Sequence, residues 1–336
     1  MKKPPIIICF VSLLSLCHFS CKNDKFPEVK NLSDYQKVVF TAYPEKVEKS
    51  DNNIIYAASF LFAWDEIKRI LGDNLNIDKV QFSDLYEMSS SSAHYTALDK
   101  SEYTTNIMVS DQTISAKAYF KKTLMFENEF ESFTNALIFN NVPVKSFGLW
   151  GDDYERSFMV KLLHYDNDDD FIVKLLPKDT EHEIILYKTK IPDKLILSDL
   201  CNEVKVKIDT GMTDKKNAMR SWRYQFEDDD KLEIPKIRYN IETNYLEFEN
   251  ASLTASGTDY EITTAYQRTA FVLNEKGAIV ESEAVADIMS APPPDEEIPE
   301  PKKLIFDKPF LIILKRGDCK KVYFMMWVAN SELMEK

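Results

Sequence analysis

The chain has 336 residues, a formal net charge of −13, five cysteines and seven glycines. Because binding to phosphate needs clustered Lys and Arg, so acidic a composition argues against nucleic acid as a partner. No internal repeat and no Pro- or Gly-rich linker divides the chain, so we expect one large domain.

The first twenty residues predict a lipoprotein-type signal peptide. Lys2 and Lys3 precede an apolar run from Ile6 to Leu16, and Ser20 stands directly before Cys21. This run is too short to span a bilayer and is typical of an export signal. Lipidation of Cys21 would attach the protein to a membrane without a spanning helix, and an ordinary secretory signal cut nearby is the alternative. We therefore expect an exported protein of a bacterial cell envelope, periplasmic or surface-exposed, or an extracellular one.

Residues 21–32 are polar and predict a tether before a single α+β domain over 33–336. Apolar spacing predicts helices over 33–43 and 57–71, and a further helix near 193–201. A short strand is expected at 53–56, while 73–100 is weakly patterned. From Tyr103 onward alternation and β-branched residues predict strands near 103–109, 113–121, 142–149, 157–164, 170–176, 231–241, 260–274, 309–316 and 321–328.

Residues that could support catalysis are few. Beyond the signal the histidines are His94, His164 and His182, and no nucleophile-elbow, zinc-protease, paired-cysteine or phosphate-loop motif occurs. We therefore expect no enzyme, no cofactor and no metal. The run 166–170 is rich in Asp, but Phe171 and Pro177 stand where a calcium loop needs Gly and Glu, so a solvated hairpin turn is expected. Cys201 and Cys319 could form one disulfide or remain two thiols.

The segment from 278 to 291 is the most informative part of the chain. Its even positions are small or apolar: Ala278, Val280, Ser282, Ala284, Ala286 and Ile288. Its three acids, Glu281, Glu283 and Asp287, stand at odd positions. This is the pattern of a strand with one buried face, although Pro292-Pro293-Pro294 and the acidic run beyond read as an exposed loop. A loop with a strand pattern suggests that it becomes a strand in some state.

Several stretches resemble one known family in the same chain order. They are Asn53-Ile54-Ile55-Tyr56 with the helix after it, Ala118-Tyr119-Phe120-Lys121, Leu175-Leu176-Pro177, Ile234-Pro235-Lys236-Ile237, Phe306-Asp307-Lys308-Pro309-Phe310 and Val322-Tyr323-Phe324-Met325. Together with the segment at 275–310, they resemble the serpins, as a divergent and shortened bacterial member. The resemblance covers about 34–332.

The resemblance implies an α+β, serpin-like fold with a large central mixed β-sheet, further sheets, flanking helices and an exposed reactive loop at about 278–305. It assigns a hinge to Glu275, Lys276, Gly277, Ala278, Val280, Ser282 and Ala284. It also implies the function: an extracellular serine or cysteine endopeptidase cleaves the loop and is trapped when the loop inserts into the central sheet. The implied target is elastase- or chymotrypsin-like, or papain-like. The inhibitor would be a monomer that touches the membrane only through its lipid.

The physics of insertion depends on the side chains. Each inserted residue gains a backbone hydrogen bond worth about 1 kcal/mol net, which roughly offsets an ordering cost of about 1–2 kcal/mol. Burial of an unpaired charge would cost several kcal/mol more. A shift of one residue would bury Glu281, Glu283 and Asp287 together, whereas the register with even positions inward buries none of them.

The reactive bond is less well defined. The family's spacing from Glu275 places it at Ala291–Pro292, where the proline blocks most proteases. Met289–Ser290 ranks first and Ser290–Ala291 second, so Met289, Ser290 and Ala291 are the candidates.

The chain also departs from the family. The histidine–asparagine pair beneath the family's sheet is replaced by Gln267 and Ala116, and its serines near the second helix by Ala57 and Phe60, with Ser59 out of step. Lys122 and Leu124 replace a Gly and a Trp. These differences keep a second function open, a non-inhibitory serpin-like surface lipoprotein that acts as a binding or scaffold module.

Overall fold

The computed structural model describes residues 26–120, 122–192, 194–216, 218–278, 300–317 and 320–336. Its α-helices are α1 (Ser59–Leu71), α2 (Ser83–Ser90), α3 (Tyr154–Ser157) and α4 (Leu197–Asp214). Short 3-10 turns lie at η1 (Leu32–Asp34), η2 (Lys100–Glu102), η3 (Ala218–Tyr224) and η4 (Ser331–Leu333).

The largest sheet, called sheet A here, has nine strands and contains both parallel and antiparallel pairs. At its centre β20 and β7 pair in parallel. β18 pairs antiparallel with β20, and β6 pairs antiparallel with β7. The strands are β1 (Lys30–Asn31), β5 (Leu75–Ile77), β6 (Thr104–Ser110), β7 (Thr113–Phe120), β8 (Leu124–Met125), β18 (Ile237–Asn244), β19 (Ser252–Ala255), β20 (Thr258–Asn274) and β21 (Gly277–Ala278).

A second sheet of seven strands, sheet B, crosses the middle of the molecule in the order β13-β14-β15-β23-β24-β4-β2. The strands are β13 (Val160–Asn167), β14 (Asp170–Leu175), β15 (His182–Lys188), β23 (Phe310–Arg316), β24 (Val322–Val328), β4 (Asn53–Ala57) and β2 (Val38–Thr41). Most side chains of its central strands are buried on both faces.

A four-stranded sheet, sheet C, has the order β22-β17-β12-β9, and its strand β22 is the first strand after the undescribed segment 279–299. The strands are β22 (Lys303–Ile305), β17 (Lys231–Pro235), β12 (Ser146–Trp150) and β9 (Glu131–Ser132). Two further pairs are β10 (Leu137–Phe139) with β11 (Val142–Val144), and β3 (Val47–Glu48) with β16 (Leu195–Ile196).

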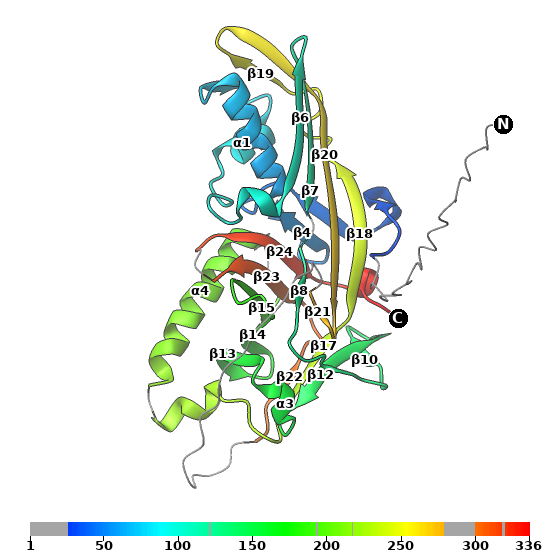
Figure 1. Ribbon diagram of the computed structural model, residues 1–336, viewed down its shortest axis with the longest axis vertical. Coiled ribbons are helices and arrows are strands. Elements are labelled where there is room, and N and C mark those ends of the chain that lie inside the picture. The colour runs from blue at the N-terminus through cyan, green and yellow to red at the C-terminus, as the bar shows by residue number, and fades with distance from the viewer. Residues whose placement is uncertain (1–25, 121, 193, 217, 279–299, 318–319) are drawn as a thin grey trace, which may run out of the picture.

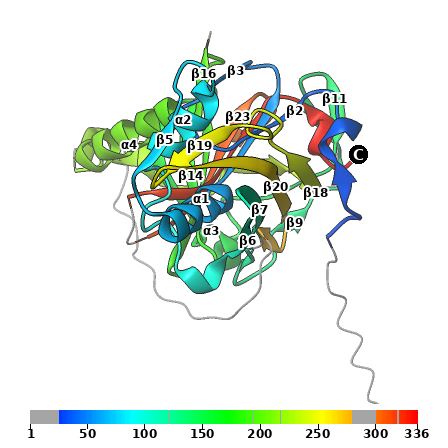
Figure 2. The ribbon, with the colours of Figure 1, turned by 90° about the horizontal axis from the view of Figure 1, so that it is seen from above.

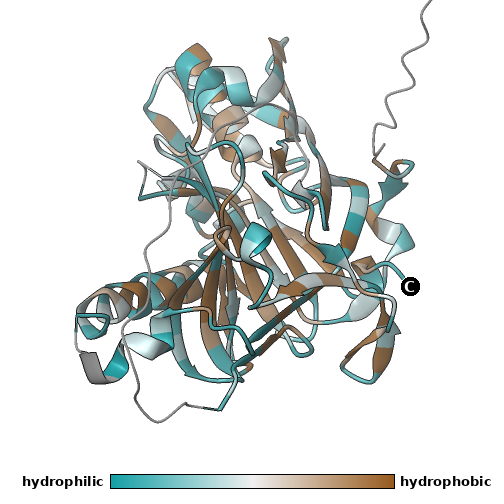
Figure 3. Ribbon diagram, turned by 60° about the horizontal axis from the view of Figure 1, so that its bottom comes forward, coloured by the Kyte–Doolittle hydropathy of each residue, from teal (hydrophilic) through white to brown (hydrophobic). Residues whose placement is uncertain are grey.

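Sheet A stands upright with α1 on one face, and no described helix covers its other face (Figures 1 and 2). Hydrophobic residues concentrate on the strands in the middle of the molecule (Figure 3). Phe324 of β24 joins the two large sheets, because its ring lies 5.9 Å from that of Phe120 on β7 and 4.8 Å from that of Phe271 on β20. The expected α+β class with a large mixed sheet is confirmed.

Three expectations for the chain order are wrong. The helix predicted over 33–43 is replaced by η1 and β2, because β2 pairs in parallel with β4 and this pairing overrides the helical apolar spacing. The tether predicted over 21–32 is shorter, since Lys30 and Asn31 pair with β18. The strands predicted from the sequence do not include β15. Its residues are buried on both faces, so apolar and polar residues do not alternate along it.

Other expectations hold. The helix predicted at 57–71 is α1, and the helix near 193–201 is the start of the longer α4. The acidic run at 166–170 is the turn between β13 and β14, as expected. Cys201 is a free, buried thiol, while Cys319, Cys21 and the signal peptide lie outside the described residues. Within the described part no helix is long and apolar enough to cross a membrane.

The position of Phe324 gives a test of the fold. Phe324→Ala removes a fully buried ring that packs on both β7 and β20, so we expect it to lower the free energy of unfolding by about 3–5 kcal/mol. Chemical denaturation measures this change. Leu246→Ala, at a side chain that is 71% exposed, should leave the midpoint nearly unchanged. Equal effects of the two substitutions would contradict the packing described.

Candidate functional site

The candidate site is the seam where β7 and β20 pair in parallel at the centre of sheet A. The described register joins Ala265 to Ala116, Gln267 to Ala118 and Thr269 to Phe120. All six side chains are 3% exposed or less and face the protein interior. Both strands are also paired on their outer sides, β7 with β6 and β20 with β18. The seam is therefore a full strand interface within a continuous sheet.

A two-residue strand, β21, separates the strands at the lower end of the seam. Ala278 pairs with Leu273 of β20 on one side and with Leu124 of β8 on the other. Since β8 follows β7 in the chain, β21 occupies the place that an additional strand between β7 and β20 would take. The chain therefore already enters the seam for two residues before residue 279, where the described part stops.

The turn before β21 is fixed by several contacts. The amides of Phe126 and Phe130 donate to the carbonyls of Lys276 and Glu275 at 2.9 and 2.8 Å. The Nζ of the buried Lys236 lies 2.6 Å from Glu275 Oε2. Gly277 has a φ of +138°, and a Cβ there would lie 2.3 Å from the carbonyl oxygen of Leu124, so this position requires glycine.

The orientation of Ala278 tests the predicted face of the hinge. Ala278 is 2% exposed and lies between two residues that are fully buried, Leu273 and Leu124. Residues directly opposite each other in a sheet point to the same face. The even position that the structure describes thus faces inward, as expected. Glu275, Lys276 and Gly277 form the turn, while Val280, Ser282 and Ala284 lie outside the described residues.

The residues that replace the family's polar pair do not meet. Gln267 accepts a hydrogen bond from the Tyr245 hydroxyl at 3.2 Å and donates to Thr269 at 3.1 Å, whereas Ala116 lies diagonally opposite across the seam. Ala57 ends β4, and Ser59 begins α1 with a buried hydroxyl that has no hydrogen-bond partner among the described residues. The polar network beneath the seam is thus confined to the β20 side.

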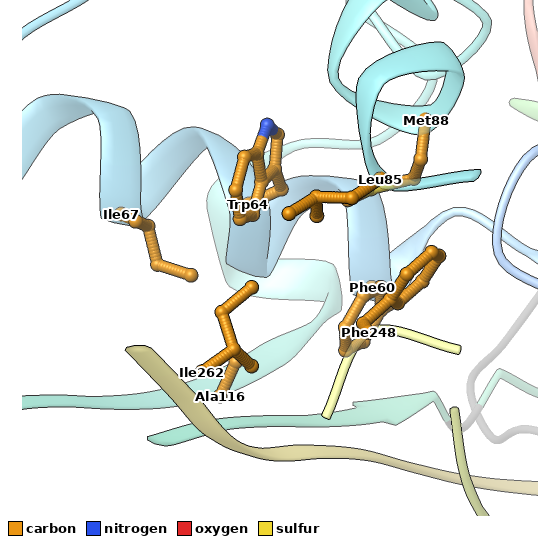
Figure 4. Close-up of a pocket in the computed structure, with 8 residues that line it drawn as sticks. All are labelled: Phe60, Trp64, Ile67, Leu85, Met88, Ala116, Phe248 and Ile262. Atoms are coloured by element: carbon orange, nitrogen blue, oxygen red, sulfur yellow. The ribbon is translucent and has the colours of Figure 1, made fainter. Parts of the chain in front are cut away.

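The space beneath the seam is apolar. A cavity of about 10 Å³ lies between α1, α2 and the two seam strands (Figure 4). Ala116 and Ile262 line it from β7 and β20, and Phe60 lines it from α1. The remaining lining residues are Trp64, Ile67, Leu85, Met88 and Phe248. This surface would accept small uncharged side chains and would exclude a charge.

The outer face of the seam is polar and carries charges of both signs, since Arg268 is paired with Glu242 of β18. Arg268 and Tyr119 are paired across the seam and point outward, and the Tyr119 ring lies 5.9 Å from that of Tyr266. Arg268 donates to Asn240 Oδ1 at 3.0 Å, and Lys117 is exposed on β7. The two faces of the seam therefore favour different classes of side chain, apolar inside and polar or charged outside.

A cluster of charged residues lies beside the lower end of the seam. Lys122, between β7 and β8, forms an ion pair with Glu102. The Nε2 of His182 lies 3.1 Å from Glu102 Oε1, and its Nδ1 lies 3.1 Å from the Tyr323 hydroxyl. A neutral imidazole satisfies both contacts, since Nε2–H donates to the carboxylate and Nδ1 accepts from the hydroxyl. Sequence reasoning missed this cluster because it joins segments that are far apart in the chain.

Burial and the nearby Lys122 and Arg316 lower the pKa of His182, against the opposite effect of Asp179 and Glu102. Oxygen or nitrogen atoms of Asp179, Glu181 and His182 lie within 4.8 Å of one another, as in metal sites. However, Lys122 and Arg316 already lie against the acids of this cluster, at 3.9 Å from Asp179 and 3.4 Å from Glu181. The protein's own cations compensate the negative charge here, and we assign no metal.

The reactive-bond candidates, Met289, Ser290 and Ala291, lie outside the described residues, as does most of the loop at about 278–305. Beyond it the chain returns at Lys302, whose Nζ forms a buried ion pair of 2.7 Å with Asp230. Both ends of the loop are thus held firmly by the body, one by β21 and the other by Lys302.

Neither a protein-family model nor a curated protein sequence matches the chain. Among solved structures it is similar to the Manduca sexta serine protease inhibitor (serpin)-12, with 14% identity, 67% of this chain and 57% of that chain covered, and a TM-score of 0.40. It is also similar to human glycosylated kallistatin (12% identity, 82% and 66% covered, TM-score 0.39) and to Serpin48 of Tenebrio molitor (12%, 75% and 64%, 0.33).

The aligned part of this chain covers less than two thirds of the Manduca sexta and Tenebrio molitor proteins, and the similarity concerns the fold alone.

The charged cluster predicts a dependence of stability on pH. Because the pKa of His182 is lowered in the folded protein, its contribution is fully present above the unfolded value of about 6.5 and is lost as the pH falls below it. We expect the free energy of unfolding to fall by at most about 1.4 kcal/mol per pH unit between pH 6.5 and 5. Urea denaturation at several pH values measures this slope.

His182→Gln retains one donor and one acceptor but does not titrate, so the slope between pH 6.5 and 5 should largely disappear. His164→Gln serves as the matched control, because His164 lies on β13 away from this cluster. A slope that is unchanged in His182→Gln would contradict the role given to His182.

Proposed function

We propose that the chain inhibits an extracellular serine or cysteine endopeptidase by suicide cleavage. The protease cuts the loop at about Met289–Ser290, and the freed segment enters the seam between β7 and β20 as a new strand. The observation that carries this proposal is β21, which already places Gly277 and Ala278 between the two halves of sheet A. An elastase- or chymotrypsin-like protease, or a papain-like one, is the proposed target.

The register of β21 supports insertion without a shift. Continued upward, the pairing of Ala278 with Leu273 and Leu124 brings Ser282 opposite Thr269 on one side and Phe120 on the other. Thr269 and Phe120 are themselves partners in the closed seam. Both neighbours therefore require the same residue of the new strand. The same rule brings Ala284 between Gln267 and Ala118, and Ala286 between Ala265 and Ala116.

The charges support the same register. With even positions inward, Glu283 would lie on the outer face directly between Arg268 and Tyr119. Opposite charges on neighbouring strands stabilise a sheet by about 0.2–1 kcal/mol, and like charges destabilise it. Glu281 and Glu283 depart from the small residues usual at the family's hinge, and Arg268 offers Glu283 an opposite charge that it shares with Glu242 of β18.

The lipid anchor on Cys21 belongs to the same proposal, because an inhibitor held at the envelope would meet proteases arriving from outside. The proposed location is an exported envelope lipoprotein that remains monomeric.

Mixing the protein with elastase, chymotrypsin, trypsin and papain tests the mechanism. Trapping predicts a complex that survives SDS gel electrophoresis and contains the cleaved chain. It also predicts that the chain nicked in the loop melts at a higher temperature than the intact chain, since insertion adds a strand to sheet A. Clean cleavage with no complex and no gain in melting temperature would instead support the second function, a binding or scaffold module.

Charge reversal at the seam tests the register. In Arg268→Glu, repulsion from Glu283 should reduce the gain in melting temperature on nicking, measured against the intact form of the same variant. Adding Glu283→Arg should restore much of that gain. If the single and double variants gain equally, Glu283 does not lie beside Arg268 and the register is wrong.

A further inference from the structure

A second surface lies where the loop returns to the body, at the corner between β12 and α3. Three large side chains are exposed in nine residues of sequence: Trp150 (47%), Tyr154 (60%) and Phe158 (38%). Exposed acids surround them: Asp152, Glu155, Glu227, Asp228 and Asp229. We call Trp150, Asp152, Tyr154, Glu155, Asp228 and Asp229 the aromatic–acidic patch. None of these side chains contributes to the seam.

Hydrogen bonds and close backbone packing fix part of the patch. The Tyr154 hydroxyl donates to Asp228 at 2.8 Å, and the Asp152 amide donates to the Asp228 carbonyl at 3.0 Å. A Cβ at Gly151 would lie 1.5 Å from the carbonyl oxygen of Glu227, so the two backbones cross in close contact. The side chains of Tyr154 and Asp228, held in this way, lose little further conformational entropy when a partner binds.

Two basic groups near the patch, Lys231 and Arg156, are already engaged. Lys231 packs between the rings of Phe133 and Trp150, at 4.9 and 5.2 Å, and pairs with Glu233 at 2.7 Å. Arg156 pairs with Asp153 at 2.7 Å. The exposed charges of the patch itself are negative, and Lys303, opposite Lys231 on β22, is an exposed cation beside it. A partner for this surface must therefore bring positive charge together with apolar area.

The patch adjoins the point at which the loop rejoins the fold. Lys231 pairs with Trp150 on one side and with Lys303 of β22 on the other. Asp230 accepts from the Gly151 amide through its carbonyl and from the Lys302 amide through its side chain. Eleven residues from Ala291 to Lys302 span at most about 40 Å when extended. A protease domain of roughly 200–250 residues has a radius of gyration of about 17 Å, so its body can reach the patch while it holds the loop.

We propose that the aromatic–acidic patch docks a basic face of the protease that attacks the loop. This inference rests on the proposed function, since it concerns the partner of the same loop. Two other binding partners are disfavoured by charge. A second copy of this chain is itself strongly acidic, and an anionic membrane surface would repel the patch. Trp and Tyr are the side chains that contribute most to protein interfaces, and the surrounding acids would raise the association rate.

The test uses the full chain and measures the rate constant for cleavage in the loop by a strongly basic neutrophil-type elastase, from 20 to 300 mM NaCl. Trp150→Ala/Tyr154→Ala should lower this rate constant about ten-fold. Asp152→Asn/Asp229→Asn should lower it at low salt and flatten its dependence on salt. The matched controls, Tyr95→Ala/Leu246→Ala and Asp73→Asn/Asp111→Asn, change exposed side chains elsewhere and should stay within two-fold of the parent.

Binding of the same elastase with its active-site serine chemically blocked gives a second readout that needs no cleavage. We expect the dissociation constant to rise about ten-fold in the aromatic double variant. Equal rate constants and equal affinities for parent and patch variants would overturn the proposal, as would the absence of binding. Trapping is scored separately, as the fraction of cleaved chain held in the SDS-stable complex. If that fraction is zero, the inhibitor function fails while the effect of the patch on cleavage can still be read.

Discussion

The parallel pairing of β7 with β20 is the constraint on which the rest of this structure depends. Two strands that run parallel cannot be joined by a short turn, and here more than a hundred residues separate them in the chain. The two strands can pair only once the chain has reached β20. Phe324 and α1 pack against the inner face of the pair. Each strand keeps another partner, so opening the seam would not leave either of them unpaired.

An antiparallel strand entering this seam would replace the single row of backbone hydrogen bonds between β7 and β20 with two rows, one to each strand. The backbone hydrogen bonds gained would roughly offset the entropy of ordering the new residues, and side-chain burial then decides the direction. The interior side offers apolar contacts from Ala116, Ala265 and Phe60, without a partner for a charge. The exterior side offers Arg268 and Lys117. A segment with small residues inside and acids outside meets both requirements, and residues 278–288 have that pattern.

The seam is also connected to its surroundings by charged residues. Lys122 stands at the junction of β7 and β8 and is held by Glu102, which also contacts His182 at the start of β15. Lys236 holds Glu275 on the opposite side of β21. Buried ion pairs contribute little net stability but fix geometry, because breaking one leaves an uncompensated charge. The Lys236–Glu275 pair fixes the turn before the two-residue strand from which insertion would proceed.

The sequence alone determined the local features whose cause is local. Alternation located the long strands β6, β7 and β20 of sheet A and β13, β14, β23 and β24 of sheet B, and the parity of the acids in 281–287 selected the inward face that Ala278 adopts. Only the tertiary structure decided the rest. Residues 38–41 form a strand despite their helical spacing because they pair in parallel with β4. β15 is buried on both faces, so its sequence lacks the alternation of apolar and polar residues by which a strand with one exposed face is predicted. The contacts of Lys122, His182 and Tyr154 join residues up to about 140 positions apart. No periodicity records such pairings, because they arise only when the sheets pack together.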